Sequence, residues 1–213
     1  MKILALELST ARGSLAWLDN DDLELAREWP NDRKNSAALF ENLDAVTKKF
    51  GAPETIIVGL GPGSYAGTRI AISAATGLEF SSRARLIGFP SICAMEYNAH
   101  EYCVIGDARR KSFFFARIRG QELMEGPTLH SESEMKAKLE TLEPAMPIFS
   151  SELLRQFERA VVRYPSALVL ARVAQQPQRS FHFPPLEPIY LRDPHITIPK
   201  RGIGILADTK DSG

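Results

Sequence analysis

Cysteine, net charge and long apolar runs are all scarce in this sequence. Only Cys93 and Cys103 occur among 213 residues, which makes neither a zinc pattern nor a disulfide framework. Lysine plus arginine equals aspartate plus glutamate at 26 each, so the total charge points to no polyanionic partner. No apolar run is long enough to span a membrane, and the start of the chain turns polar too soon for a signal peptide. These absences favour a cytoplasmic protein with two buried thiols.

The motifs of several enzyme classes are missing as well. No two of the four histidines lie four positions apart, which excludes a His-x-x-x-His metal pair; they are His100, His130, His182 and His195. The sequence has no Gly-x-Ser-x-Gly elbow and no glycine-rich loop ending in Lys-Ser or Lys-Thr. We therefore predict no catalytic residue and no metal site, and we expect no hydrolase or kinase activity from the chain alone.

The composition, 44% hydrophobic and 24% charged, is that of an ordinary globular protein. Patterns of apolar residues predict a three-stranded meander, then alternating strands and helices, then a second half that begins with strands. The predicted strands are 3–8, 14–18, 23–29, 55–60, 86–89, 102–106, 112–119, 122–125 and 147–150. The predicted helices are 36–50, 64–80, 91–97, 131–142, 152–159 and 166–176. The sequence shows no internal repeat.

This order indicates an α/β fold in which helices pack on mixed sheets. It is the order of the actin-like ATPase (ribonuclease H-like) superfold, built from two small subdomains. We place the first subdomain at 1–100 and a smaller one at 101–198, followed by a loose tail at 199–213.

The stretch TIIVGLGPGSYAGTRIAISAATGLEF, residues 55–80, predicts a buried strand, a tight turn and a helix. Glycines at 61 and 63 permit positive φ, and Ser64 can cap the helix through its hydroxyl. Two interpretations stay open. The turn is either an anion site at a helix N-terminus or a sharp corner that presents an adhesive helix.

Helices 36–50 and 64–80 each carry an apolar stripe, and small residues widen the stripe of the second helix. Small side chains allow another helix to approach closely. We predict that this pair forms a partner interface through Leu39, Leu43, Val46, Gly67, Arg69, Ile70, Ala71, Ala74, Ala75 and Leu78.

Two acidic residues are candidates for a site. Glu7 ends the first strand and is the better candidate for a relic nucleotide or phosphate pocket, which would comprise Glu7, Ser9, Thr10, Gly61, Gly63 and Ser64. Asp107 and Arg109 could form an acid–base pair, but in a charged turn a structural role is favoured.

Four segments resemble the TsaB (YeaZ-type) family. ILALELST is similar to the family's ILAIDTST opening, and GPGSYAGTRIAISAATGLE to its GPGSFTGLRIGLS…KGLA segment. GDARRKSFFFARI resembles its DARR-plus-strand segment, and PIYLR, residues 188–192, its P-x-Y-L-R ending. Departures occur at Glu7, where the family has Asp, at Asn35 beside Ser36, where His-Ser is common, and at Thr68 and Ala71, which replace Leu and Gly.

The resemblance implies a non-catalytic subunit of the complex that makes N6-threonylcarbamoyladenosine on tRNA. Such a subunit pairs through two helices with a TsaD-type catalytic subunit, and a TsaE-type ATPase joins them. In isolation it forms a homodimer and meets tRNA only indirectly, through the complex. It requires no cofactor of its own, so ATP and Mg²⁺ would bind only at the partner or at the complex interface. The alternative is a self-sufficient nucleotide-dependent phosphotransferase or ATPase of the same superfold.

Overall fold

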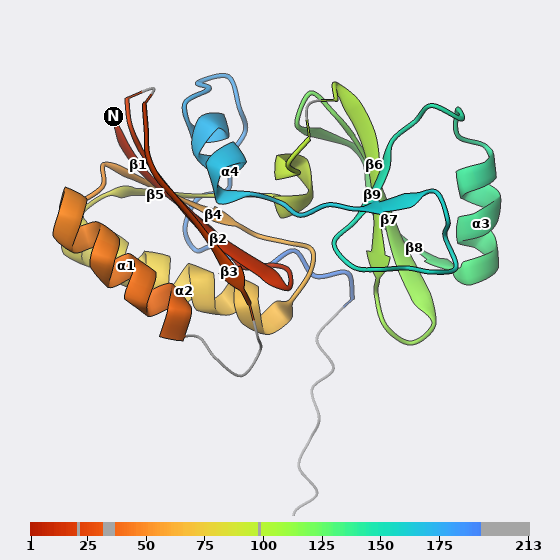
Figure 1. Cartoon of the computed structure of the whole chain (residues 1–213), viewed down its shortest axis with the longest axis horizontal. Coiled ribbons are helices and arrows are strands. Elements are labelled where there is room, and N and C mark those ends of the chain that lie inside the picture. The colour runs from red at the N-terminus through yellow and green to blue at the C-terminus, as the bar shows by residue number, and fades with distance from the viewer. Residues whose placement is uncertain (21, 32–36, 98, 193–213) are drawn as a thin grey trace, which may run out of the picture.

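The computed structural model describes residues 1–20, 22–31, 37–97 and 99–192, and two five-stranded sheets form its frame (Figure 1). The first sheet contains β1 (Lys2–Glu7), β2 (Arg12–Asp19), β3 (Asp22–Pro30), β4 (Thr55–Gly59) and β5 (Arg85–Phe89). The second contains β6 (Glu101–Asp107), β7 (Ser112–Arg119), β8 (Glu122–Ser131), β9 (Ile148–Ser150) and β10 (Ala160–Val162). The helices are α1 (Ala37–Phe50), α2 (Tyr65–Ser82), α3 (Glu132–Glu140) and α4 (Ala167–Ala174), with a 3₁₀ turn, η1, at Ser91–Ala94.

Both sheets have the same connectivity. The first runs β3-β2-β1-β4-β5 and the second β8-β7-β6-β9-β10. In each, a three-stranded antiparallel meander is followed by two strands that pair in parallel. The chain is therefore a topological repeat. The amino-acid sequence hides it because the shared feature is strand order and not residue identity.

Helices and sheets stack in layers that enclose three cores. Helices α1 and α2 cover one face of the first sheet and α4 the other, while α3 covers the outer side of the second sheet (Figure 1). The central core joins side chains of both sheets, α4 and η1, so the two halves share apolar surface. One outer core lies under α1 and α2, and the other lies under α3.

The chain after β10 returns to the first sheet. Helix α4 packs on β1, β2 and β4, and the backbone of His182 pairs with that of Gly88 in β5. Farther along, the N–H of Ile189 donates to the carbonyl of Leu60 at 2.8 Å. The predicted unit 101–198 thus includes a C-terminal segment that packs with the first half. The tail 199–213 lies outside the described residues.

The predicted helix 152–159 is wrong. Leu154 and Phe157 are buried in the core of the second sheet. Two successive turns form this stretch: the Phe157 N–H donates to the Leu154 carbonyl, and the Ala160 N–H donates to the Phe157 carbonyl. The apolar spacing predicts a helix, but the turns bury the same two side chains without one. They deliver the chain to β10, a strand that the sequence did not predict, which pairs with β9 in parallel.

Strand β8 is also longer than predicted, because it continues past Gly126-Pro127 to Ser131. A register shift in its pairing with β7 accommodates these two residues, and Gly126 has a φ of +83°. A bulge of this kind lets a strand pass a residue that cannot donate a ladder hydrogen bond. No helix in the described part of the chain is long and apolar enough to cross a membrane.

Candidate functional site

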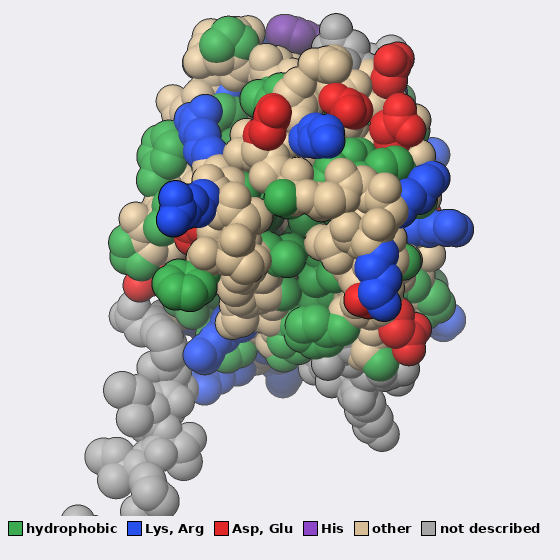
Figure 2. Space-filling model, turned by 90° about the vertical axis from the view of Figure 1, so that its left-hand side faces the viewer, with side chains coloured by type: hydrophobic (Ala, Val, Ile, Leu, Met, Phe, Trp, Pro, Cys, Tyr) green, Lys and Arg blue, Asp and Glu red, His purple; other side chains and the backbone are tan. Residues whose placement is uncertain are grey.

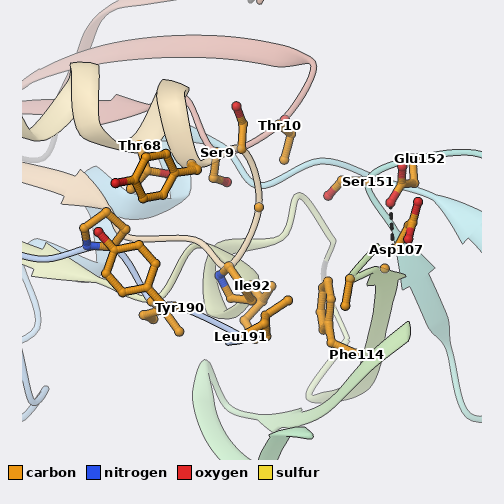
Figure 3. Close-up of a pocket in the computed structure, with 18 of the residues that line it drawn as sticks. Ser9, Thr10, Thr68, Ile92, Asp107, Phe114, Ser151, Glu152, Tyr190 and Leu191 are labelled. Carbon is orange, nitrogen blue, oxygen red and sulfur yellow. Dashed lines mark hydrogen bonds between the residues drawn. The ribbon is translucent and has the colours of Figure 1, made fainter. Parts of the chain in front are cut away.

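A cleft of about 730 Å³ opens between the two halves of the molecule (Figure 3). The first half contributes Ser9 and Thr10 after β1 and the turn that leads into α2. The second half contributes Asp107 at the end of β6 and Arg109 just after it, and the C-terminal segment adds Tyr190. Of the six predicted phosphate-site residues, Ser9, Thr10, Gly63 and Ser64 line this cleft, whereas Glu7 and Gly61 do not.

The turn into α2 is built as the sequence predicts, and two of its amides are bonded within the protein. Ser64 caps the helix, with its hydroxyl accepting from the Gly67 N–H at 3.3 Å. The Ser64 N–H donates to the carbonyl of Ser9 at 2.5 Å. These two N–H groups, which an anion at a helix N-terminus would use, are therefore bonded within the protein.

The two glycines of this turn have different roles. Gly61 has a φ of +87°, as predicted, and this is a backbone conformation that glycine tolerates better than residues with a Cβ. Gly63 has no positive φ, so backbone strain does not explain why glycine occupies this position. A Cβ at Gly63 would lie 2.1 Å from the Ser9 carbonyl oxygen, and glycine is needed there for close approach.

Glu7 lies beneath the cleft and not on its wall. Its side chain is fully buried, its Oε1 accepts from the Ser9 N–H at 2.6 Å, and its Oε2 has no hydrogen-bond partner in the described chain. The carboxyl packs on the bare Cα of Gly59, where a Cβ would lie 1.7 Å from Oε2. Burial raises the pKa of Glu7 above its ordinary value of 4.5, and the neighbouring Ser9 and Ser91 oppose this only in part.

We expect the stability of the protein to depend on pH through the ionisation of Glu7. Because its pKa is raised in the folded state, Glu7 binds its proton more tightly there, and the free energy of unfolding falls as pH rises above about 4.5 through the folded pKa. Replacing Glu7 with Gln removes this loss. We expect the melting temperature of Glu7→Gln to exceed the parent's by a margin that grows from about pH 4 to about pH 8. The exposed Glu41→Gln is the control for loss of one negative charge, and a margin independent of pH would contradict the assignment.

Asp107 orders the turn that follows β6. Its Oδ1 accepts from the Arg109 N–H at 2.6 Å, and its Oδ2 pairs with the Arg109 guanidinium at 2.9 Å. The Asp107 N–H in turn donates to Glu152 at 2.8 Å (Figure 3). This is the structural role that the sequence favoured for Asp107. No three His, Cys, Asp or Glu side chains gather to hold a metal within the described ranges.

A second candidate surface lies on α1 and α2, at the end of the molecule away from the second sheet. Six of the ten predicted interface residues are buried in the chain's own core and cannot form an open surface: Leu39, Leu43, Val46, Gly67, Ala71 and Ala75. They are buried because the stripe nearest the sheet must cover it, which leaves only the flanks of the helices open. Of the other four predicted residues, Arg69 is exposed, and Ile70, Ala74 and Leu78 are half-buried.

Apolar side chains remain open on this end of the molecule. Phe40 is 52% exposed and Phe80 is 91% exposed, while Ile70, Ala74 and Leu78 are half-buried at the edge of the core. Figure 2 shows hydrophobic side chains gathered in a hollow at the middle of this face. We call Phe40, Ile70, Ala74, Leu78 and Phe80 the helix-pair face. Exposed apolar side chains that gather on one face are typical of a protein–protein contact.

The sequence reasoning missed the aromatic side of the cleft. Tyr65 and Tyr190 both line it, and their ring centroids lie 5.6 Å apart. The segment PIYLR carries no local signal that its tyrosine folds back onto the start of α2.

Comparisons with known proteins identify the family and the fold of the chain. The family model described as TsaD, tRNA N6-adenosine threonylcarbamoyltransferase, matches residues 36–193, about three quarters of the chain. A Pseudomonas aeruginosa protein described as similar to the peptidase YeaZ is 21% identical, with a TM-score of 0.70, over 90% of this chain and 99% of that one. YeaZ from Pseudomonas aeruginosa is 21% identical, with a TM-score of 0.64, over 82% and 91%. No curated protein matches the sequence.

These findings confirm the predicted α/β fold of the actin-like ATPase (ribonuclease H-like) class and the predicted resemblance to the TsaB (YeaZ-type) family. The match to the family model covers the turn into α2, the turn after β6 and the tyrosine segment of the cleft. The chain belongs to the TsaD family of tRNA N6-adenosine threonylcarbamoyltransferases and has the fold of YeaZ.

Proposed function

We propose that this chain is a non-catalytic subunit of the complex that makes N6-threonylcarbamoyladenosine on tRNA. It would bind a TsaD-type catalytic subunit through the helix-pair face and thereby hold that subunit in an active state. The observation that carries the proposal is the family match over residues 36–193, which ties the chain to this tRNA modification.

The surface chemistry supports a binding role. The helix-pair face offers two exposed phenylalanines around a half-buried apolar strip, and burying such side chains against a partner is favourable by about 25 cal/mol per Å². A second copy of this chain would present the same face about a two-fold axis, so a homodimer in isolation and a heterodimer in the complex would compete for it. A TsaE-type ATPase would join that heterodimer.

Catalysis is assigned to the partner for reasons of chemistry. The cleft holds the Asp107 and Glu152 carboxylates, but the first orders a turn and the second accepts a backbone N–H. The amides of Ser64 and Gly67 are bonded internally, which leaves the turn into α2 fewer N–H donors for a triphosphate. ATP and Mg²⁺ would accordingly act at the catalytic subunit or at its contact with this chain.

Reconstitution tests the proposal. The purified chain is mixed with a TsaD-type subunit, a TsaE-type ATPase and tRNA, and threonylcarbamoyladenosine is measured with each protein omitted in turn. We expect a stable complex with the TsaD-type subunit and loss of product when this chain is left out. ATP turnover by the chain alone that disappears in Glu7→Ala would instead favour the phosphotransferase alternative. Absence of any complex would refute the proposal.

A further inference from the structure

Two chain segments connect the halves of the molecule, and they meet at the floor of the cleft. The first follows η1 and the second precedes α4, and a β-bridge joins Met95 of the first to Pro165 of the second. Pro165 and Ile92 line the cleft, and the Ile92 carbonyl accepts from the Tyr102 hydroxyl of β6 at 3.0 Å. Ile92, Met95 and Tyr102 belong to the core that both halves share. A rotation of one half against the other would therefore pivot about this floor.

The two rims of the cleft are not bonded to each other. Figure 3 shows Ser9 and Tyr190 on one side of the cleft and Asp107 and Glu152 on the other. Tyr190 lies against Tyr65 of its own rim, and Asp107 donates its N–H to Glu152 of its own rim. Within the described residues, no hydrogen bond or ion pair crosses from one rim to the other. No polar bond across the cleft therefore fixes the angle between the halves.

Polar bonds between the halves occur on the opposite side. The Arg179 guanidinium, after α4, pairs at 3.1 Å with the Glu122 carboxylate at the start of β8. Beside this pair, the Gln176 amide donates to the Gln121 side chain at 3.5 Å. Through β7, Glu122 is in register with Glu101, the first residue of β6, whereas the last three residues of β6 line the cleft. At about 3.3 Å per residue, the ion pair and the cleft lie at opposite ends of the second sheet.

The 3₁₀ turn η1 lies between the cleft and this ion pair. Ile92 of η1 lines the cleft. Burial raises the pKa of the next residue, Cys93, to about 12, while the charge of Arg179 lowers it and that of Glu122 raises it, so both charges lie near Cys93. A rotation about η1 that brings the rims of the cleft together must therefore move Arg179 away from Glu122.

Arg179 is held in place by its own half of the molecule. Its side chain is only 14% exposed, and its Nε donates to the Gln176 Oε1 at 2.6 Å. An exposed ion pair usually contributes little, in part because two mobile side chains must be ordered to form it. At Arg179 most of that ordering is already present. The pair with Glu122 therefore resists separation of the halves better than a pair of freely moving side chains would.

We propose that Arg179 and Glu122 form a latch that holds the cleft open, with the hydrogen bond between Gln176 and Gln121 beside it. While the ion pair is intact, the side opposite the cleft stays closed and the rims stay apart. When the pair is lost, the halves rotate about η1 and the rims approach each other. The inference concerns the angle between the halves, so it does not depend on the proposed function.

Double electron–electron resonance on the full chain tests the latch. One spin label is attached at Ser73→Cys on α2, whose first turn forms one rim, and the other at Leu153→Cys, next to Glu152 on the other rim. Both positions are exposed, and the distance between the labels reports the angle between the halves. The native Cys93 and Cys103 are buried, and a sample without the introduced cysteines measures any labelling of them.

The variants change one ion pair at a time in this labelled chain. The test variant is Glu122→Lys, which places like charges together, and the combination of Arg179→Glu with Glu122→Lys restores opposite charges. The matched control is Glu125→Lys on the same strand, because Glu125 pairs with Lys138 at 2.7 Å within the second half. Glu122→Gln removes the charge without adding repulsion. Circular dichroism checks that each variant is folded.

We expect one long distance in the parent and a second, shorter distance in Glu122→Lys, with the ratio of short to long raised by at least about fivefold. Glu122→Gln should shift the distribution in the same direction by less, and it decides alone if Glu122→Lys does not fold. The double reversal and Glu125→Lys should match the parent. An unchanged distribution in the Glu122 variants or a shift to longer distances would overturn the inference. An equal shift in Glu125→Lys, or no return to the parent distribution in the folded double reversal, would do the same.

Discussion

Ala74→Arg should give a folded chain that no longer binds a TsaD-type subunit or a second copy of itself. Ala74 lies on the flank of α2, half-buried at the edge of the core under α1 and α2. In the free chain the long side chain can turn outward and keep its charge in water. In the complex the same guanidinium would be buried without a partner, at a cost of about 3–5 kcal/mol. That cost weakens binding by more than about a hundredfold.

Circular dichroism, light scattering and pull-down on one preparation separate the outcomes. The matched control is Ala137→Arg, the same change at an exposed position on α3. It should leave both fold and binding unchanged. Unfolding of Ala74→Arg would place Ala74 in the core of the chain. A folded Ala74→Arg that retains dimer mass and captures the partner would end the proposal of a helix-pair interface.

Local chemistry explains which elements the sequence could predict. Ser64 at the start of α2 and the reciprocal bonds between Ser131 and Glu134 at the start of α3 are short-range signals, and the structure has both caps. The meander strands are likewise set by apolar runs and polar turns. Each of these signals acts within a few residues and needs no knowledge of the rest of the chain.

Long-range packing explains which features of the structure the sequence did not predict. Leu154 and Phe157 have the spacing of a helix, yet their burial under the second sheet is decided by contacts with distant strands. The division of α2 into a buried and an open flank depends on how the helix lies on β1, β4 and β5. The cleft needs both halves and a C-terminal segment that returns to β5, so its tyrosine pair had no local signal.

A glycine within α2 should show how tightly that helix is seated. Gly67→Ala would ordinarily stabilise a helix, since alanine has the higher helix propensity by about 1 kcal/mol. At Gly67, however, a Cβ would lie 2.1 Å from the carbonyl oxygen of Leu8, which also accepts from the Asn31 side chain at 3.0 Å. The backbone there cannot yield without moving the end of β1. We expect a net loss of about 3 kcal/mol, from overpacking in a close contact.

Gly77→Ala is the control in the same helix. No atom lies within 4 Å of a Cβ placed there, so only the propensity acts, and the variant should gain about 1 kcal/mol. In a chain of this length 1 kcal/mol shifts the melting temperature by about 2–4 °C. Gly67→Ala should therefore melt about 6–12 °C below the parent and Gly77→Ala about 2–4 °C above it. The same substitution on one helix then has opposite signs, because the contact between α2 and the end of β1 outweighs the propensity. Two variants that shift in the same direction would show that α2 can lift from β1 at little cost.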